Sequence, residues 1–242
     1  MAKMVRHGMK KQVCGEFPEF CYRAFDHEEH AEQFIYTGTF RMGCLLSYRE
    51  IEDESRRDPT EGIGWTKEPD MTTVALVSRN PTETIWTKEM GYKEHHIPGG
   101  GKIFCFCTYL PDVSLDYMKK RLDRYFVKIN DPRKLAEDIN DYFIGKGQSF
   151  VIVGCKVVYD KGQKLDRILT VNERLDLAYK QKPESFSPEC EFRIVAINSG
   201  EPCNREECKF ITGESDQVDP QCRFIEVDLG KQLNYVSWVN LE

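Results

Sequence analysis

Apolar and polar residues follow two different periods along this chain, and each period predicts a different kind of element. Alternation, or a short apolar run between turn residues, is typical of strands. These patterns predict extended segments at residues 19–25, 72–79, 103–110, 126–129, 148–160, 187–197, 222–229 and 233–241. Apolar residues three or four positions apart are typical of helices and predict them at residues 26–38, 112–126, 131–147 and 171–181.

The ends of two predicted helices carry residues that begin or stop helices. Asp26 is an N-cap-type residue, Gly38 is a glycine stop, and Pro132 fits the first turn of the helix at 131–147. About four helices lie irregularly among the strands, without the strand-helix-strand rhythm of a doubly wound sheet. The sequence therefore predicts an α+β fold with a mixed, mainly antiparallel sheet as its core.

The length of the chain, 242 residues, allows one large domain or two small ones. Aromatic residues make up 12% of the chain and apolar residues 40%, which is typical of a folded globular protein. Because no change of composition marks a boundary, we expect a single α+β domain over residues 19–242. The basic N-terminus lacks the apolar run of a secretory signal, and we expect residues 1–18 to be a mobile leader.

Charge and cysteine content limit the partners and the compartment. The net charge of −6 argues against nonspecific binding of nucleic acid over the whole surface, because such binding depends on basic residues. No apolar run approaches the roughly 20 residues of a membrane helix, so no membrane partner is expected. Without a secretory signal, the ten cysteines are expected to stay reduced in the cytoplasm.

The segment "PGGGK" at residues 98–102 contains glycines but lacks the pattern of a phosphate-binding loop. That loop has Ser or Thr directly after its lysine and opens a helix, whereas Ile103 begins a strand pattern. We therefore expect a hairpin turn at this segment.

Neither the cysteines nor the histidines follow a known pattern of metal ligands. No CxxC pair occurs, and we expect the thiols of Cys105 and Cys107 to face opposite sides of a strand. His27 and His30 lie one helical turn apart beside several glutamates, as on a solvated helix face. The sequence therefore predicts no metal site at these residues.

Charged residues of both signs gather in "IEDESRRDPTEG", residues 51–62, which a proline interrupts and a glycine closes. A solvated surface loop has such a composition. A loop that grips a charged ligand has it too, because carboxylates can hold arginines in a fixed geometry beside an anion. The candidates for such a site are Arg56, Arg57, Asp58 and Glu61.

A second charged group lies in "FSPECEFRIV", where Glu189, Glu191 and Arg193 alternate with apolar residues. A period of two places these three residues on one face of a strand and the apolar residues on the other. If the strand is central, the charged face lines a site; an outer strand would simply have a wet face. Two carboxylates directed into a cleft also repel each other unless a cation, an arginine or a hydroxyl-rich ligand lies between them.

The segments "CYR", "YREIEDESRRDPTEG", "IFCFCTYL", "FVIVGCKVVYD" and "YKQKPESFSPECEFRIV" follow one another over about residues 20–197. Their order resembles that of bacterial and phage proteins related to abortive-infection proteins of the AbiGi kind. The chain departs from them at Thr108, which follows Cys107 where such proteins often have serine. The resemblance implies a role in conflict between phage and host.

The segments "CYRAF" and "ECEFRIV" also resemble parts of ADP-ribosyltransferases. That fold carries an Arg or His on an early strand, an aromatic residue that stacks on nicotinamide, and a glutamate on a late strand. Arg23 is similar to the early basic residue and Glu191 to the late glutamate, with Glu189 two positions before it as in the arginine-modifying branch. The Ser-Thr-Ser strand of that branch is absent, which speaks against an arginine acceptor.

The second resemblance implies NAD as the substrate and no metal, with an unidentified protein or nucleic acid as the acceptor. Arg23 would hold the diphosphate, since a planar two-pronged donor suits phosphate oxygens. Glu191, helped by Glu189, would stabilise the positive charge that develops on the ribose as its bond to nicotinamide breaks.

The remaining candidates take supporting roles in the same resemblance. Tyr22 or Tyr48 would stack on the nicotinamide, and Arg56 or Arg57 would contact a phosphate or the acceptor. The orienting residues would be Asp58, Glu61 and Arg193.

Two other classes of function remain open. A metal-dependent nuclease or phosphodiesterase would bind Mg²⁺ or Mn²⁺ through Asp58, Glu61, Glu189 and Glu191, because hard cations prefer carboxylate oxygens. A non-catalytic phage or host interaction protein would instead present an acidic surface to its partner.

Overall fold

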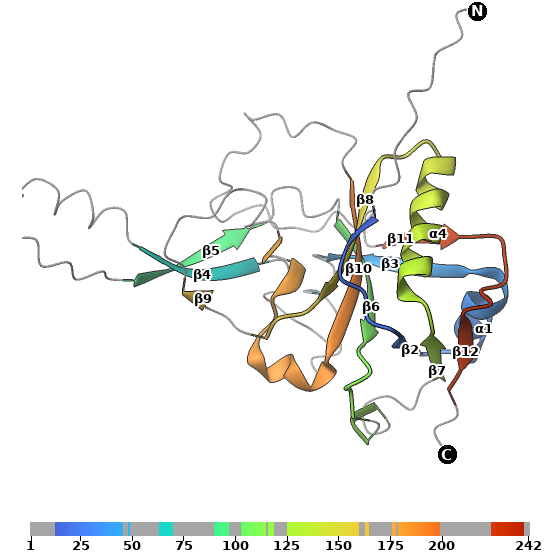
Figure 1. The fold of residues 1–242 in the computed structure, drawn as a ribbon, viewed down its shortest axis with the longest axis horizontal. Coiled ribbons are helices and arrows are strands. Elements are labelled where there is room, and N and C mark those ends of the chain that lie inside the picture. Colours follow the sequence, from blue (N-terminus) through green and yellow to red (C-terminus); the bar gives the residue numbers. More distant parts are fainter. Residues whose placement is uncertain are drawn as a thin grey trace, which may run out of the picture.

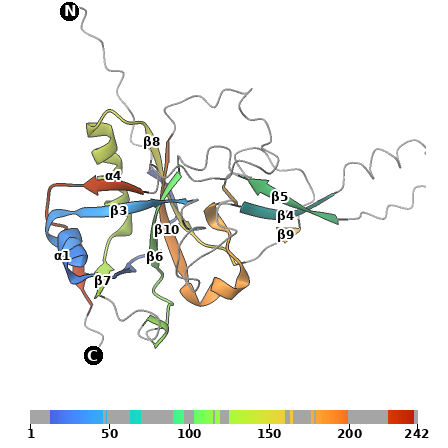
Figure 2. The ribbon, with the colours of Figure 1, turned by 180° about the vertical axis from the view of Figure 1, so that it is seen from behind.

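Two β-sheets form the frame of the molecule, and helices α1 and α4 pack against the larger one (Figures 1 and 2). The computed structural model describes residues 13–45, 48, 63–69, 90–96, 103–114, 116–118, 125–159, 163–164, 176–177, 179–198 and 224–239. In the larger, nine-stranded sheet, seven strands follow one another in the order β1 (Val13–Gly15), β8 (Phe150–Lys156), β10 (Glu191–Asn198), β6 (Ile103–Tyr109), β2 (Cys21–Phe25), β7 (Tyr125–Ile129) and β12 (Val236–Trp238).

The other strands complete both sheets. Strands β3 (Thr39–Cys44) and β11 (Phe224–Asp228) pair with each other and join the large sheet through β6. The smaller sheet has three strands in the order β5 (Met90–His96), β4 (Ile63–Pro69) and β9 (Gln163–Lys164). In both views the smaller sheet and the helices α1 and α4 lie on opposite sides of the large sheet (Figures 1 and 2).

The predicted α+β class is confirmed. Helices are interspersed irregularly among the strands, and most strand pairs are antiparallel; among the named strands that are described, the parallel pairs are β1 with β8 and β4 with β9. Within the described part of the chain, no helix combines the length and the apolar character needed to cross a membrane.

Strand β6 is the point where the large sheet divides. One edge of β6 pairs with β10 along its whole length. The other edge is shared, because Cys105 pairs with Gly43 of β3 while Tyr109 pairs with Tyr22 of β2. The β2-β7-β12 and β3-β11 branches therefore separate beside Cys107, and its carbonyl group needs a partner other than a strand.

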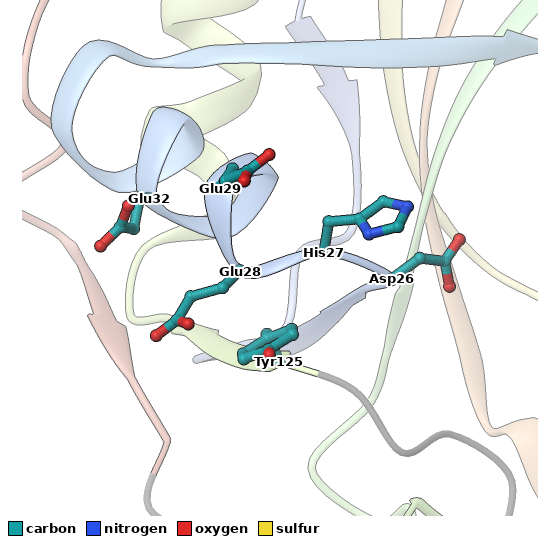
Figure 3. A pocket seen from close by; sticks show the side chains of 6 residues that line it. All are labelled: Asp26, His27, Glu28, Glu29, Glu32 and Tyr125. Carbon is teal, nitrogen blue, oxygen red and sulfur yellow. The ribbon is translucent and has the colours of Figure 1, made fainter.

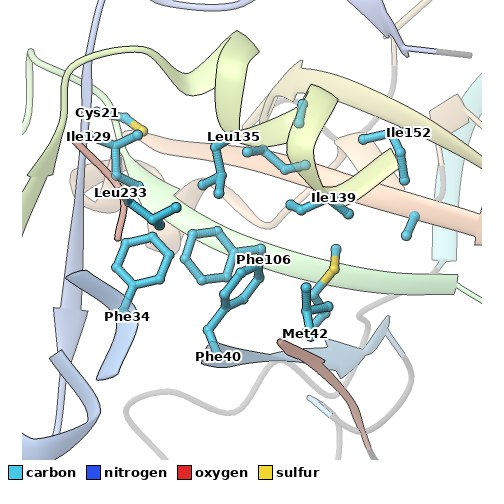
Figure 4. Packing of buried hydrophobic residues seen from close by; sticks show 14 of the residues in the cluster. Cys21, Phe34, Phe40, Met42, Phe106, Ile129, Leu135, Ile139, Ile152 and Leu233 are labelled. Carbon is cyan, nitrogen blue, oxygen red and sulfur yellow. The ribbon is translucent and has the colours of Figure 1, made fainter. Parts of the chain in front are cut away.

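The main core lies between the sheet and the two helices (Figure 4). Helix α1 (Glu28–Thr37) places Phe34 between the two branches, where its ring centroid is 5.3 Å from that of Phe40 and 5.5 Å from that of Phe106. Helix α4 (Pro132–Gly145) covers β8, and the ring of Phe143 stacks on that of Phe150. Burial of these large apolar side chains is the main force that holds helices and sheet together.

The caps of the two helices follow the sequence closely. At α4, the carboxylate of Asp131 accepts a hydrogen bond from the backbone N–H of Lys134 at 2.9 Å, and Pro132 lies in the first turn. At α1, Gly38 has φ of 69° and ends the helix as predicted. The N-cap of α1 is His27, one residue after the predicted Asp26.

A second apolar cluster lies on the other face of β6, β10 and β8, and includes Cys105, Cys155, Val195 and Tyr179. Cys107 packs against the same cluster. The expectation that the thiols of Cys105 and Cys107 face opposite ways was therefore wrong, because residues two apart on a strand point to the same side. The described cysteines are all free.

The N-terminal part of the sheet differs from the sequence prediction. Strand β1 pairs with β8 in parallel, and the ring of Phe17 packs over Gly154 so closely that a Cβ atom there would lie 2.5 Å from it. The predicted mobile leader at residues 1–18 is therefore wrong for residues 13–17, because Val13–Gly15 form a strand and Phe17 covers the sheet; residues 1–12 lie outside the described residues.

Two predicted connections concern the segments before β6 and β7. The predicted hairpin turn at residues 98–102 lies outside the described residues, and the strands on either side of it, β5 and β6, belong to different sheets. Tyr125 and Phe126 begin strand β7, although the spacing had extended the helix at 112–126 through them. Strands β4 and β5 were not predicted, and the predicted strand at 72–79 lies outside the described residues.

Candidate functional site

Strand β10 is central, between β6 and β8, and it buries two charged side chains on one face. Glu191 is 3% exposed and Arg193 is 1% exposed, whereas the intervening Phe192 faces the main core. The Nε atom of Arg193 donates to Oε1 of Glu191 at 2.7 Å. Its Nη2 atom lies 3.4 Å from Oε2 of Glu191, so the guanidinium spans both oxygens of the carboxylate. The predicted period of two is therefore confirmed for this pair.

Glu189 reaches the same place from a different element. It ends the 3₁₀ helix η3 (Glu184–Glu189; orange in Figure 1), and Cys190 follows with a left-handed φ of 44°. The prediction that Glu189 belongs to the strand was wrong, because Pro188 and this left-handed residue start the strand only at Glu191. The two carboxylates nevertheless come together.

Lys182 lies between the two carboxylates. Its Nζ atom is 2.7 Å from Oε2 of Glu191 and 2.9 Å from Oε2 of Glu189. The side chain of Lys182 is 10% exposed, so its charge is largely removed from water. Sequence reasoning did not find Lys182; the only signal for it was that two buried carboxylates require a cation between them.

The charge of Glu191 is fixed by its neighbours. Burial alone would raise the pKa of its carboxyl group, but the Arg193 guanidinium and then the Lys182 ammonium outweigh burial and hold the pKa well below its usual range. Glu191 is therefore ionised at neutral pH.

Two tyrosines hold the backbone and side chains of this cluster. The backbone N–H of Glu191 donates to the hydroxyl oxygen of Tyr159 at 2.8 Å. Arg193 donates from Nη1 to the carbonyl oxygen of Tyr179 at 2.9 Å. Burial first, and the charge of Glu191 second, raise the pKa of Tyr159, so its hydroxyl group stays protonated. We name the group of Lys182, Glu189, Glu191 and Arg193 the buried charge cluster.

Arg23 occupies the place where the sheet divides. Its Nη1 atom donates to the carbonyl oxygen of Cys107, the group that neither branch of the sheet pairs. The guanidinium carbon lies 4.9 Å from the ring centroid of Phe106 and 5.6 Å from that of Phe25, in cation–π contact with both. Its Nε atom is buried and has no hydrogen-bond partner among the described residues.

Tyr109 of β6 links Arg23 to the buried charge cluster. It pairs with Tyr22 on one side and with Glu191 on the other, so these three residues share a face of the sheet. Burial raises the pKa of Tyr109 to about 12, Arg23 lowers it, and Glu189 and Glu191 raise it. The charged groups of both regions therefore act on one phenol.

Tyr48 also lies at the divided edge of the sheet. Its hydroxyl group is 3.5 Å from the carbonyl oxygen of Cys105 and 3.5 Å from the sulfur of Cys107. Burial is the main cause that raises the pKa of Tyr48, and it also raises the pKa of Cys107 to about 12. Cys107 is therefore a thiol at neutral pH, which excludes it as a thiolate nucleophile in this arrangement.

The structure thus brings together Glu189, Glu191 and Arg193. Tyr22 lies on the same face of the sheet across β6, whereas Arg23 leaves β2 on the opposite face and reaches the division of the sheet. The ring of Tyr22 meets that of Phe20 edge to face, so it is partly covered. Four predicted site residues lie outside the described residues: Arg56, Arg57, Asp58 and Glu61.

A separate surface cavity of about 410 Å³ opens at the start of α1, lined by Asp26, His27, Glu28, Glu29, Glu32 and Tyr125 (Figure 3). The acidic side chains point in different directions in this view instead of converging on one point. Among the described residues, no group of three or more His, Cys, Asp or Glu side chains has an arrangement that would hold a metal ion.

No protein-family model, no curated protein and no solved structure matches this chain.

Proposed function

We propose that the protein is an ADP-ribosyltransferase-like enzyme that uses NAD to modify a protein or nucleic acid in the cytoplasm, in conflict between phage and host. The observation that carries this proposal is the arrangement around Tyr109. Arg23 on the early strand β2 and Glu191 on the late strand β10 are 168 positions apart, yet their strands flank β6 on its two sides. Arg23 leaves β2 on the face opposite to Tyr22 and Glu191, and its guanidinium reaches the division of the sheet at the carbonyl oxygen of Cys107. The resemblance implies a site formed by an early strand with an arginine and a late strand with a glutamate.

The electrostatics of Glu191 support the chemistry. Breaking the bond between ribose and nicotinamide develops positive charge on the ribose, and only an ionised carboxylate stabilises that charge. Arg193 and Lys182 keep Glu191 ionised despite its burial. Glu189 adds a second carboxylate to the site, because Lys182 contacts both Glu189 and Glu191.

The state of Arg23 supports its role as a diphosphate ligand. One nitrogen of its guanidinium already donates to Cys107, which fixes the orientation of the group. In the part of the chain that the structure describes, the buried Nε donor has no partner, so it remains able to donate to a phosphate oxygen that reaches the division of the sheet.

The test measures NAD binding by calorimetry and nicotinamide release by chromatography. We expect Glu191→Gln to bind NAD but to release nicotinamide at least about a hundredfold more slowly, because the amide keeps the shape and loses the charge. We expect Arg23→Met to weaken NAD binding by roughly tenfold, the value of a charged hydrogen bond.

The matched control is Glu226→Gln, which removes a carboxylate paired with Arg41 on the exposed surface. It is expected to leave both measurements unchanged. Absence of NAD binding and of nicotinamide release in the unaltered protein would overturn the proposal.

A further inference from the structure

The two cations that contact Glu191 are held in different ways. Arg193 belongs to the central strand, contacts the carboxylate with two nitrogens and donates a third to the carbonyl of Tyr179. Its side chain stands between Cys107 and Cys155, the residues paired with it on the neighbouring strands. Arg193 therefore cannot leave Glu191 without disturbing the sheet.

Lys182 comes from outside the sheet. Its backbone N–H donates to the carbonyl oxygen of Val158 at 3.0 Å, beside the isolated bridge between Val158 and Gln181. From there its flexible side chain carries the ammonium group to Glu191 and Glu189, with the Nζ atom 5.1 Å from the ring centroid of Phe186. An ammonium on four rotatable carbons can change its acceptor by rotation alone.

The Oε2 atom of Glu191 is the acceptor for which a ligand would compete. Oε1 accepts the short bond from Arg193, whereas Oε2 receives Lys182 at 2.7 Å and Arg193 only at 3.4 Å. Glu189 provides a second carboxylate on which the ammonium can remain when it leaves Oε2.

We propose that Lys182 is a latch on Glu191: its ammonium group covers Oε2 in the free protein and withdraws to Glu189 when the ribose hydroxyls of NAD bind Glu191. This inference rests on the proposed function. Glu189 is then the residue that receives the displaced charge, and the cost of moving Lys182 lowers the affinity for NAD.

The experiment compares NAD affinity, measured by calorimetry, in variants with opposite expected effects. Lys182→Met removes the competing ammonium and keeps the length of the side chain, so we expect NAD to bind about tenfold more tightly. Glu189→Gln removes the negative charge of the alternative acceptor and so favours Lys182 on Glu191, and we expect NAD to bind more weakly, by roughly threefold or more. If the ion pair between Lys182 and Glu189 had only a structural role, both substitutions would change the NAD affinity in the same direction.

Two further variants serve as controls. Lys180→Met removes a lysine from the same segment that pairs with Asp176 at 2.9 Å, and we expect no change in NAD affinity. Lys182→Arg restores a cation between the carboxylates, and we expect the affinity to return towards that of the unaltered protein. Circular dichroism of each variant checks that the fold is retained.

The outcomes separate the latch from the proposed function. If the unaltered protein binds NAD but Lys182→Met binds no more tightly, the latch is wrong and the proposed function stands. If Lys182→Met does not fold, Glu189→Gln decides, since unchanged or tighter binding in that variant contradicts the latch. If neither the unaltered protein nor any variant binds NAD, both proposals fail.

Discussion

Two buried carboxylates in this protein are neutralised in contrasting ways. Asp138 on α4 is 4% exposed and accepts hydrogen bonds from Lys134 at 3.0 Å and Tyr235 at 2.7 Å, with Lys231 at 2.9 Å. The side chains of these two lysines are 44% and 49% exposed. Glu191 is buried to a similar degree, but its cations are buried with it.

The two clusters differ in how much it costs to remove their charges from water. The lysines at Asp138 keep most of their hydration while they reach inward, so the cluster joins α4 to the C-terminal segment at small cost. The buried charge cluster removes two cations and two carboxylates from water, which costs more than ion pairing alone regains in most proteins. Such a costly arrangement in a central strand makes these residues candidates for a functional site.

The largest expected effect comes from the cluster with buried cations. Arg193→Met leaves Glu191 buried with Lys182 as its remaining partner in the cluster, so we expect the free energy of unfolding to fall by about 3–5 kcal/mol. Urea denaturation measures this change. In the double variant Arg193→Met with Glu191→Gln, part of the stability should return, because residue 191 no longer carries a buried charge that has lost its guanidinium partner. No recovery would show that packing of Arg193 is what matters.

Asp138→Asn should have a smaller effect than Arg193→Met. The amide still accepts a hydrogen bond from Tyr235 but no longer attracts the lysines, so we expect a loss of about 1–3 kcal/mol in urea denaturation. Glu137→Gln, which alters the neighbouring residue on α4, is the control and should stay within about 0.5 kcal/mol of the unaltered protein. A loss as large as that of Arg193→Met would contradict the contrast drawn between the two clusters.

The pH dependence of stability should also distinguish Asp138. Burial would raise its pKa, but hydrogen bonds from Lys231, Tyr235 and Lys134 outweigh burial and lower the pKa below the ordinary value of 3.8. A carboxyl group with a lowered pKa stabilises the fold above its ordinary pKa, and this contribution is lost as the pH falls through the folded-state value.

Urea midpoints at pH 7, 5, 4 and 3 would therefore be measured for the unaltered protein and for Asp138→Asn. The difference between them should be constant from about pH 7 to 5 and should shrink below about pH 4. A difference that grows as the pH falls would contradict the direction of the pKa shift.

The smallest effects are expected from the exposed lysines at Asp138. Lys134→Met and Lys231→Met should each lower stability by less than about 1 kcal/mol, because the other lysine still pairs with Asp138 and water screens both charges. The loss should shrink further in 0.5 M salt. Urea denaturation at two salt concentrations checks this. A loss of stability that is the same at both salt concentrations would indicate that packing of the lysine side chains is responsible instead.

Local patterns predicted a large part of the fold. The alternation in "ECEFRIV" was enough to put Glu191 and Arg193 on one face of a strand, and Asp131, Pro132 and Gly38 fixed helix ends. Prediction failed where neighbouring residues compete. Pro188 and the left-handed Cys190 separate Glu189 from the strand, and Tyr125 joins β7 although its spacing also fits a helix.

The candidate site was predictable only in part. The residues Glu189, Glu191 and Arg193 stood out because they are close in the sequence and charged. Lys182 did not, because nothing in "YKQKPE" indicates which lysine turns inward. The orientation of Lys182 depends on the bridge between Val158 and Gln181, a contact between segments that are 23 positions apart.

The sequence by itself determined the α+β class and the charged face of β10, because these depend on composition and on the periods of strands and helices. Only the tertiary structure decided that β6 divides the sheet, that Arg23 fills the division and that Lys182 joins two carboxylates. These contacts connect residues far apart in the chain, and their geometry follows from how strands pair and which buried polar groups must find partners.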